Sequence, residues 1–318
     1  MKAWVLRGVG DLGFEDVPAP ALKPGEALVR VESAGVCSSD IQRVFAGGAY
    51  HYPIILGHEF SGVVEATHDA GDSRWIGRRV GAFPLLPCFE CDSCGRGEYE
   101  TCSDYSYMGS RRDGAFAEYI AVPKWNLVEL PANVGFIQGA LLEPTAVALH
   151  AARQLDFANL GSVAVVGNGT IGNLVARWLK NFGVSDVALI GRADMPARRF
   201  DACVEAAGAA GSLGRCVELS RPGGQLVLVG NPAADFMIGQ KLYWQILRKQ
   251  LIIRGSWNSR YRDDWQTAIE AISRRGIAPE GLVARRCGLD ELGAEMSNLW
   301  GKSVHGKVVA SLGAGGGP

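Results

Sequence analysis

The sequence has almost no net charge and no long apolar run. Its 32 basic and 33 acidic residues leave a formal charge of −1, so the chain lacks the strongly basic surface that nucleic acid or an anionic membrane would attract. No apolar stretch approaches the roughly 18 to 20 residues that cross a bilayer. Charge also appears within the first seven residues, before any apolar leader core can form. We therefore expect a cytoplasmic protein with no nucleic-acid and no membrane partner.

Internal repeats are absent, and low complexity is confined to the glycine-rich end. Residues 313–318 have nothing to bury, so we expect a loose tail there. The chain of 318 residues is 47% hydrophobic and 20% charged, which is enough for two domains with a core each.

Cysteines are few, and half of them gather in one segment. Four of the eight lie between positions 88 and 102, and the others, Cys37, Cys203, Cys216 and Cys287, are scattered. This distribution favours metal binding in a reducing compartment over a framework of disulfides.

The clustered cysteines form the pattern Cys-x2-Cys-x2-Cys-x7-Cys, at Cys88, Cys91, Cys94 and Cys102. Four thiolates are a typical ligand set for structural zinc, which binds them tetrahedrally and keeps no open position. We expect this ion to fasten a loop and to take no part in catalysis.

Strand-like patterns prevail up to about residue 131. Residues 25–31 alternate after a Pro-Gly turn, residues 60–66 are β-branched and apolar, and residues 114–120 resemble a further strand. A lone strand pattern at 306–310 could return to this β-rich body. The expected first domain comprises residues 1–140 and 276–318.

After Glu143-Pro144 the pattern changes to strands that alternate with helices, which predicts a parallel, doubly wound sheet over residues 141–275. The expected strands are 162–166, 187–190, 201–205, 225–229 and 251–253. The expected helices are 170–182, 241–249 and 263–275.

A glycine-rich turn joins the first of these strands to the first helix. Gly167-x-Gly169-x-x-Gly172 follows the strand, and Thr170 and Ile171 begin the helix. In this context backbone N–H groups and a helix N-terminus bind a pyrophosphate, so the turn predicts a dinucleotide site. The alternative is a tight turn without a ligand.

The end of the next strand should recognise the adenosine ribose. Sites for NAD place a carboxylate there to bind the 2′-hydroxyl, whereas sites for NADP replace it and supply arginine. Here the position is Gly191, followed by Arg192, with Arg198 and Arg199 close behind. NADP is therefore favoured over NAD. The alternative is that these arginines belong to a solvated loop, and Asp194 lies too far along to serve confidently as the carboxylate.

A second candidate metal site combines Cys37, His58, Glu59 and Glu143. A sulfur, an imidazole and a carboxylate are the ligands of an open catalytic zinc site. A lone cysteine is more often a buried small hydrophobic residue, and a lone His-Glu pair is a weak signal. These residues by themselves leave both interpretations open.

Together the motifs resemble the zinc-dependent medium-chain alcohol dehydrogenases, in particular their polyol branch, nearest to galactitol-1-phosphate and sorbitol dehydrogenases. The resemblance covers nearly the whole chain. The segments that carry it are residues 35–40 (GVCSSD), 52–62 (YPIILGHEFSG), the four-cysteine lobe, 109–114 (GSRRDG), 142–144 (LEP), 246–249 (ILRK) and 255–257 (GSW).

This resemblance implies a GroES-like β-rich catalytic domain and a Rossmann domain. It implies that Cys37, His58 and one or both of Glu59 and Glu143 hold a catalytic zinc, beside the structural one. It places Ser39 where the family keeps a hydroxyl that relays a proton, although a helix N-cap is the alternative. It also implies a homodimer or a homotetramer.

Two features depart from the family. Ser38 stands where the family usually has glycine, for which we expect a local adjustment with the metal retained. Only eight residues, 193–200, separate strand 2 from strand 4, where two crossovers and strand 3 need about 25 or more. Strand 3 is an edge strand, so we expect a five-stranded sheet of order 2-1-4-5-6. The link must span some 20 Å and can reach about 26 Å, so it should be extended, as Pro196 encourages.

The expected reaction is hydride transfer between a secondary alcohol or its ketone and NADP. Polyols, sugar alcohol phosphates and cyclitols are compatible substrates. The alternatives are an epimerase or eliminase with transient oxidation and a catalytically silent NADP(H)-binding sensor. Candidate pocket residues, each equally explained by core or surface roles, are Phe45, Tyr50, His51, Tyr52, Arg111, Arg112 and Trp257.

Overall fold

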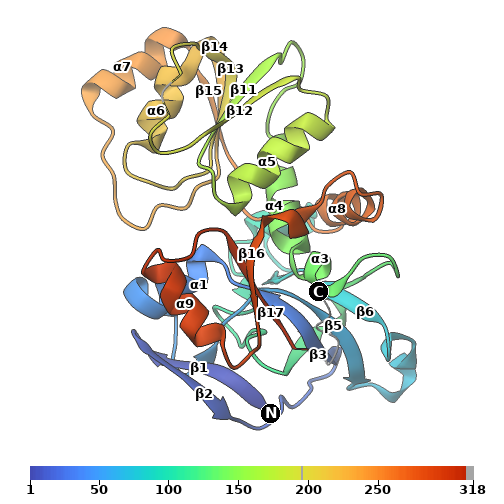
Figure 1. Ribbon diagram of the computed structural model, residues 1–318. Helices are drawn as coiled ribbons and strands as arrows, with labels where there is room; N and C mark the ends of the chain where they lie inside the picture. The colour runs from blue at the N-terminus through green and yellow to red at the C-terminus, as the bar shows by residue number, and fades with distance from the viewer. Residues whose placement is uncertain (195, 313–318) are drawn as a thin grey trace. The chain divides into compact units, whose positions relative to one another are not determined.

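The structure is a computed structural model that describes residues 1–194 and 196–312 (Figure 1). It divides into two units: Met1–Glu143 together with the chain from Trp265 onward, and Pro144–Asp264. The divisions fall after Glu143 and Asp264, where the sequence led us to expect residues 140 and 275. The expected tail, 313–318, lies outside the described residues.

The first unit is built mainly from short β-strands. Its strands are β1 (Lys2–Gly8), β2 (Asp11–Asp16), β3 (Glu26–Gly35), β4 (Ile54–Ile55), β5 (Glu59–Thr67), β6 (Arg79–Ala82), β7 (Leu85–Leu86), β8 (Ser106–Tyr107), β9 (Tyr119–Pro123), β10 (Leu127–Glu129), β16 (Val283–Cys287) and β17 (Lys307–Ser311). Its helices are α1 (Ser38–Gln42), α2 (Asp92–Gly95), α3 (Phe136–Ala140) and α9 (Leu292–Trp300). Helices α4 (Leu142–Arg153) and α8 (Asp263–Ser273) contain the two divisions between the units.

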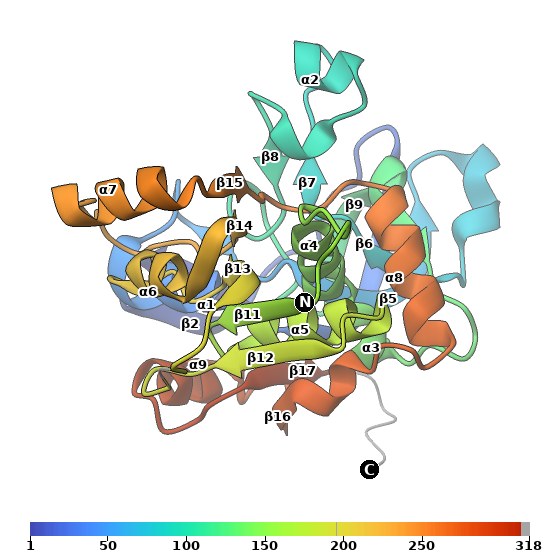
Figure 2. The ribbon, with the colours of Figure 1, turned by 90° about the horizontal axis from the view of Figure 1, so that it is seen from above.

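Its main sheet has the order β10-β6-β5-β3-β17-β16, and β9 also pairs with β3. The returning strand expected at 306–310 is β17, which pairs antiparallel with β3. Apolar side chains of β1, β3 and β5 form one core with Leu292 and Met296 of α9. Smaller sheets are β2-β1-β4 and β7-β8, and Figure 2 shows the lobe with α2 beyond β7 and β8.

The strand expected at residues 114–120 begins later in the structure. The strand pattern at 114–120 becomes a strand only from Tyr119, where β9 begins. The preceding residues bind a different part of the chain, because the N–H groups of Gly114, Ala115 and Phe116 donate to the carbonyls of residues 55 to 57. This segment therefore supports the turn that leads into the candidate metal site.

The second unit is a parallel sheet with helices on both sides. Its strands are β11 (Ser162–Val166), β12 (Asp186–Ile190), β13 (Phe200–Glu205), β14 (Ser220–Leu228) and β15 (Ile252–Gly255). Its helices are α5 (Thr170–Asn181), α6 (Ser212–Leu219) and α7 (Gln240–Lys249). Figure 1 shows α5 on one side of the sheet and α6 and α7 on the other.

The order β12-β11-β13-β14-β15 confirms the expected five-stranded sheet, because β12 is strand 2 and β13 is strand 4 of the full fold. All four pairings are parallel. The link from β12 to β13 is not extended throughout, since residues 192 and 193 form a turn. It then runs back along β12, whose first residue, Asp186, forms an ion pair with Arg198 of the link.

No helix within 1–194 and 196–312 is both long and apolar enough to cross a membrane.

Candidate active site

Strand β5 begins where the chain leaves a tight turn at Gly57. Gly57 has φ of +95°, which favours glycine, and a Cβ there would lie 2.5 Å from the Phe116 ring. His58 and Glu59 follow directly and are both buried. Across the sheet Gly35 of β3 pairs with Glu59, and a Cβ on Gly35 would come within 2.4 Å of Glu59 Oε2. Gly35 thus makes room for the buried Glu59 carboxylate, and Gly57 makes room for the Phe116 ring.

Cys37 lies at the N-terminus of α1, just after β3. Its N–H donates to Asp40 Oδ2 at 3.0 Å, and Asp40 is fully buried. Asp40 Oδ1 lies 3.5 Å from His58 Nδ1. The carboxylate thus stands beside both candidate ligands, and its approach to Nδ1 leaves Nε2 of His58 for a metal. Burial alone would lower the pKa of His58, but the Asp40 carboxylate holds this pKa well above its usual value.

The two serines after Cys37 take ordinary positions. Ser38 is exposed and is the first residue of α1, so a helical backbone suffices where the family has glycine. Ser39 is half-buried in the first turn, and the N-cap position belongs to Cys37.

Cys37, His58 and Glu59 offer ligand atoms that all lie within 4.8 Å of one another. Their sulfur, nitrogen and oxygen donors fit zinc, and three protein ligands leave a fourth position for a substrate or water. Glu143 is not part of this group of three. The sequence prediction that a sulfur, an imidazole and a carboxylate meet here agrees with the geometry.

Lys307, from β17, completes the surroundings of Glu59. Its ammonium group donates to Glu59 Oε1 at 2.7 Å, to Oε2 at 2.6 Å and to the Val36 carbonyl at 2.9 Å. Burial acts to lower the pKa of Lys307, but the Glu59 carboxylate more than offsets this and raises it. The sequence analysis missed this residue. The available signal was a lysine at the head of the apolar run Val308-Val309-Ala310, which must find a partner when buried.

Glu143 lies close by and binds Tyr107, which the sequence analysis also missed. The Tyr107 hydroxyl donates to Glu143 Oε1 at 3.2 Å, and its ring lies edge-on to the His58 ring with centroids 5.6 Å apart. Burial raises the pKa of Glu143 to about 7; attraction to His58 opposes this shift and repulsion from Glu59 adds to it. Tyr107 and Glu143 therefore border the three-ligand cluster.

A cationic and aromatic cluster continues from Tyr107. Tyr105 lies next to it with ring centroids 6.3 Å apart, and the Arg111 guanidinium lies over the Tyr105 ring at 4.4 Å and the Tyr50 ring at 4.7 Å. His51 Nε2 approaches the Arg111 carbonyl at 3.3 Å. Of the expected pocket residues, Tyr50, His51 and Arg111 thus come together.

The other expected pocket residues have local partners. Arg112 forms an ion pair of 2.9 Å with the buried Glu26, which is a structural role. Phe45 stacks on Trp300, and the Tyr52 hydroxyl accepts from the Ala49 N–H. Trp257 belongs to the second unit and is half exposed.

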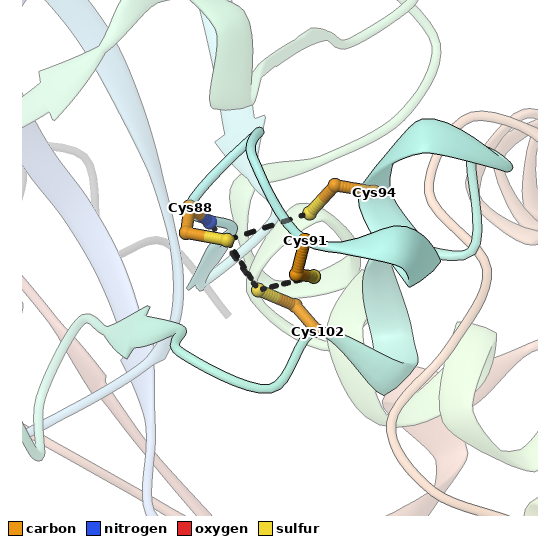
Figure 3. Close-up of side chains that lie close together, drawn as sticks. All are labelled: Cys88, Cys91, Cys94 and Cys102. Carbon is orange, nitrogen blue, oxygen red and sulfur yellow. Dashed lines mark hydrogen bonds between the residues drawn. The ribbon is translucent and has the colours of Figure 1, made fainter.

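The four-cysteine lobe brings its sulfurs together (Figure 3). The Cys88–Cys94 pair is separated by 4.0 Å, the Cys91–Cys102 pair by 3.9 Å and the Cys88–Cys102 pair by 3.5 Å. A tetrahedron of thiolates around zinc at about 2.3 Å has edges of about 3.8 Å. All four are free thiols, so the geometry fits zinc and excludes disulfides between them.

The cysteines of the lobe differ in the pKa of their thiols. Backbone hydrogen bonds lower the pKa of Cys91 to about 5, whereas burial raises that of Cys94 to about 12. A bound cation would favour the thiolate form of all four.

In the second unit, the glycine-rich turn has the backbone that a pyrophosphate requires. Gly167 has φ of +117°, and a Cβ on Gly172 would lie 1.9 Å from the Gly167 carbonyl oxygen, so both positions demand glycine. Gly169 is the N-cap of α5, and Thr170 is the first residue of the helix. A Cβ on Gly169 would meet nothing within 4 Å, which leaves the helix N-terminus open to a ligand.

The end of β12 differs from expectation. Gly191 and Arg192 lie there as predicted, but the N–H of Gly191 donates to Asp194 Oδ2 at 2.8 Å. Arg198, expected near a 2′-phosphate, pairs with Asp186 at the other end of the strand. Asp194 is distant from the strand end along the sequence, but the turn at residues 192–193 brings it back to Gly191.

A β-rich unit with two metal-ligand clusters and a parallel sheet with a dinucleotide-type turn define a metal-dependent oxidoreductase of two domains. Residues 23–132 match the alcohol dehydrogenase GroES-like domain. Galactitol 1-phosphate 5-dehydrogenase of Escherichia coli K12 is 33% identical over 343 positions, which cover 97% of this chain and 99% of the relative. The alignment is longer than this chain of 318 residues, so the relative contains residues that this chain lacks.

Solved structures of dehydrogenases resemble this chain as well. The crystal structure of galactitol-1-phosphate dehydrogenase from Escherichia coli superposes with a TM-score of 0.90 at 32% identity, covering 98% of this chain and 100% of that one. A protein from Sinorhizobium meliloti 1021, described as a zinc-binding dehydrogenase and bound to NADP, gives a TM-score of 0.87 at 25% identity, with 98% of each chain covered. The chain belongs to the zinc-dependent medium-chain alcohol dehydrogenases, in their polyol branch, and is an oxidoreductase.

Proposed function

We propose that the protein transfers a hydride between a secondary alcohol of the polyol class and a nicotinamide dinucleotide. The observation that carries this proposal is the mixed set of Cys37, His58 and Glu59 donors bordered by Glu143 and Tyr107. Within this proposal the first unit is the catalytic domain, and the second unit binds the dinucleotide.

Two zinc ions per chain follow from the two clusters. Cys37 and His58 hold the catalytic ion, with Glu59 as the third ligand that the geometry favours. Glu143 is the alternate carboxylate, because burial raises its pKa to about 7 and so a cation nearby would favour its ionised form. The four lobe cysteines, Cys88, Cys91, Cys94 and Cys102, hold the structural ion.

When bound, zinc supplies a Lewis acid that lowers the pKa of the alcohol, and nicotinamide supplies the hydride acceptor. The residues of the chain position the alcohol and move its proton. Tyr107 and Glu143 form a hydrogen-bonded pair at the cluster, and Ser39, in the first turn after Cys37, is the proposed hydroxyl for proton relay. Asp40 fixes His58, and Lys307 fixes Glu59.

The substrate we propose is a polyol that carries a phosphate. Arg111 and His51 lie with Tyr50 and Tyr105 in the cluster that adjoins Tyr107. Arginine binds phosphate with two parallel hydrogen bonds, and aromatic rings suit the carbon face of a polyol. The relative named for galactitol 1-phosphate supports this choice over an unphosphorylated polyol or a cyclitol.

We also propose that the protein forms a homodimer, or a tetramer built from such dimers, through the edge of its parallel sheet. Strand β15 is the last of its sheet, and its Ile252 and Ile253 are 49% and 39% exposed. Helix α7 has no buried residue and exposes Tyr243 and Leu247. An unpaired apolar edge of this kind favours pairing with another strand, and a two-fold axis lets both copies use the same surface.

The test of the function is zinc content combined with reduction of NAD and NADP over a panel of polyols and their phosphates. We expect two zinc ions per chain and steady NAD(P)H formation with a polyol phosphate. Replacing Arg111 with methionine should raise KM for the phosphorylated substrate more than for its unphosphorylated counterpart. Zinc-loaded protein without turnover on any alcohol would refute the proposal.

A further inference from the structure

Gly191, which follows β12, has no side chain, and the Asp194 carboxylate lies in the space that a side chain there would enter. A Cβ on Gly191 would lie 2.9 Å from Asp194 Oδ2 and 3.4 Å from Asn168 Nδ2 of the glycine-rich turn. A carboxylate oxygen of an aspartate at position 191 would lie about 2.4 Å from its own Cβ. The Asp194 carboxylate therefore lies close to the position where this fold usually has an acidic residue at the end of the second strand.

This arrangement is fastened by several hydrogen bonds. The Gly191 N–H donates to Asp194 Oδ2 at 2.8 Å, and the Asp194 N–H donates to the Gly191 carbonyl at 3.3 Å. Arg215 of α6 donates to the Gly191 carbonyl at 3.0 Å, to the Arg192 carbonyl at 3.2 Å and also to the Asp194 carbonyl. The guanidinium thus holds the turn from the side of α6.

Two nearby arginines, Arg198 of the link and Arg215 of α6, are engaged elsewhere. Arg198 donates two hydrogen bonds to Asp186, at the opposite end of β12, and lies over the Phe200 ring at 4.4 Å. Arg215 is engaged with backbone carbonyls. Arg192 is exposed and remains the rival determinant of cofactor choice.

We propose that Asp194 is the residue that selects NAD over NADP. The inference rests on the proposed function, since it requires that the second unit binds a nicotinamide dinucleotide. The Asp194 carboxylate accepts a hydrogen bond from the adenosine 2′-hydroxyl of NAD, and its charge repels the 2′-phosphate of NADP. This reverses the preference that Gly191 and Arg192 predict from the sequence, because the shortened link folds back and returns a carboxylate to the strand end.

The test is the dissociation constant of NADH and of NADPH for the zinc-loaded full chain, measured by calorimetry and by quenching of tryptophan fluorescence. We expect the wild-type protein to bind NADH at least about tenfold more tightly than NADPH, a difference of about 1.4 kcal/mol. Asp194→Asn keeps the acceptor for the Gly191 N–H but removes the charge, and it should reduce the ratio of the two constants at least about tenfold.

Two controls distinguish a specific effect of Asp194 on cofactor selection from a general loss of structure. Asp186→Asn removes a carboxylate from the other end of β12, and it should leave the ratio unchanged. The double variant Gly191→Asp/Asp194→Gly moves the acid to the strand end, and it should restore the NADH preference that Asp194→Gly alone loses.

Tighter binding of NADPH by the wild-type protein would overturn the proposal, and so would an unchanged ratio in Asp194→Asn. A larger shift in Arg192→Ala than in Asp194→Asn would assign the selection to Arg192 and overturn it too. In each of these cases the dehydrogenase function would stand. Binding of neither nucleotide would refute the proposed function itself, and the inference with it.

Discussion

The four-cysteine lobe and the Cys37–His58–Glu59 cluster obtain their ligands in opposite ways. The lobe takes four sulfurs from fifteen consecutive residues, Cys88 to Cys102, and their separations of 3.5 to 4.0 Å match a closed tetrahedron. The cluster takes a different donor from each of three residues, and its supports, Lys307 and Tyr107, come from strands far along the chain.

Under the proposed function, this difference gives one chain a closed site and an open site for the same ion. Four protein donors close the coordination of zinc and stabilise a loop, whereas three protein donors leave a position for a reacting molecule. In the cluster two of the three ligand side chains have a charged neighbour: Asp40 for His58 and Lys307 for Glu59. The contrast predicts that changes at the two sites alter different properties.

The largest expected effect separates activity from stability. Cys37→Ser should lower kcat at least about 1,000-fold, which is about 4 kcal/mol of transition-state stabilisation, because the Lewis acid is lost. Zinc content should fall from two ions to one per chain, with little change in Tm. Metal analysis, steady-state kinetics and thermal unfolding measure the three quantities. Cys287→Ser is the control, since this buried thiol binds the Val309 carbonyl and belongs to neither cluster. Retention of both ions in Cys37→Ser would contradict the contrast.

The second-largest expected effect is a loss of stability with little loss of activity. Cys94→Ser should release the lobe ion and lower the free energy of unfolding by about 4 kcal/mol, the stabilisation given by an ion present at about 1,000 times its Kd. The catalytic ion should remain, so kcat measured well below the new Tm should change far less than in Cys37→Ser. Unfolding monitored by circular dichroism checks the first part. An unchanged Tm after the loss of the lobe ion would mean that the lobe is not a structural site.

A smaller effect sharpens the role of the supporting residues. Lys307→Met removes the cation that binds both oxygens of Glu59, and we expect the affinity for the catalytic ion to fall by about 10-fold to 100-fold. Competition with a chromogenic chelator measures this affinity without any turnover. Lys124→Met is a matched control, because Lys124 pairs with Asp69 and Asp72. Equal affinities in the two variants would show that Lys307 has no influence on the ion.

The smallest expected effect concerns Tyr107. Tyr107→Phe keeps the ring beside His58 but removes the hydrogen bond to Glu143, which is worth about 1 kcal/mol, so kcat/KM should fall about fivefold. The zinc content should stay at two ions per chain. The pH dependence of kcat/KM provides the decisive readout, because the hydroxyl stabilises ionised Glu143 and its removal should shift the acidic limb to higher pH. A profile identical to that of the wild-type protein would remove Tyr107 from the proton path.

The same comparison explains how much could be predicted from the sequence. The lobe was predictable because its ligands and its spacing lie in one segment, and so were the five parallel strands, whose apolar runs are long enough to read individually. The three-ligand cluster followed from the residue types together with the family resemblance.

The missed residues depend on contacts between distant parts of the chain. Lys307 reaches Glu59 only because β17 pairs with β3, and Asp194 reaches Gly191 only because the link turns at residues 192–193. The expected pocket residue Arg112 instead binds Glu26, since the buried carboxylate on β3 needs a cation. Such pairings are set by tertiary packing, and spacing along the chain does not encode them.

Graded removal of zinc from the wild-type protein tests the central claim most directly. Samples treated with increasing chelator are divided for metal content, kcat and Tm. The account predicts that activity disappears with the first equivalent of zinc while Tm holds, and that Tm falls with the second. Loss of activity and stability together with a single class of ion would contradict it.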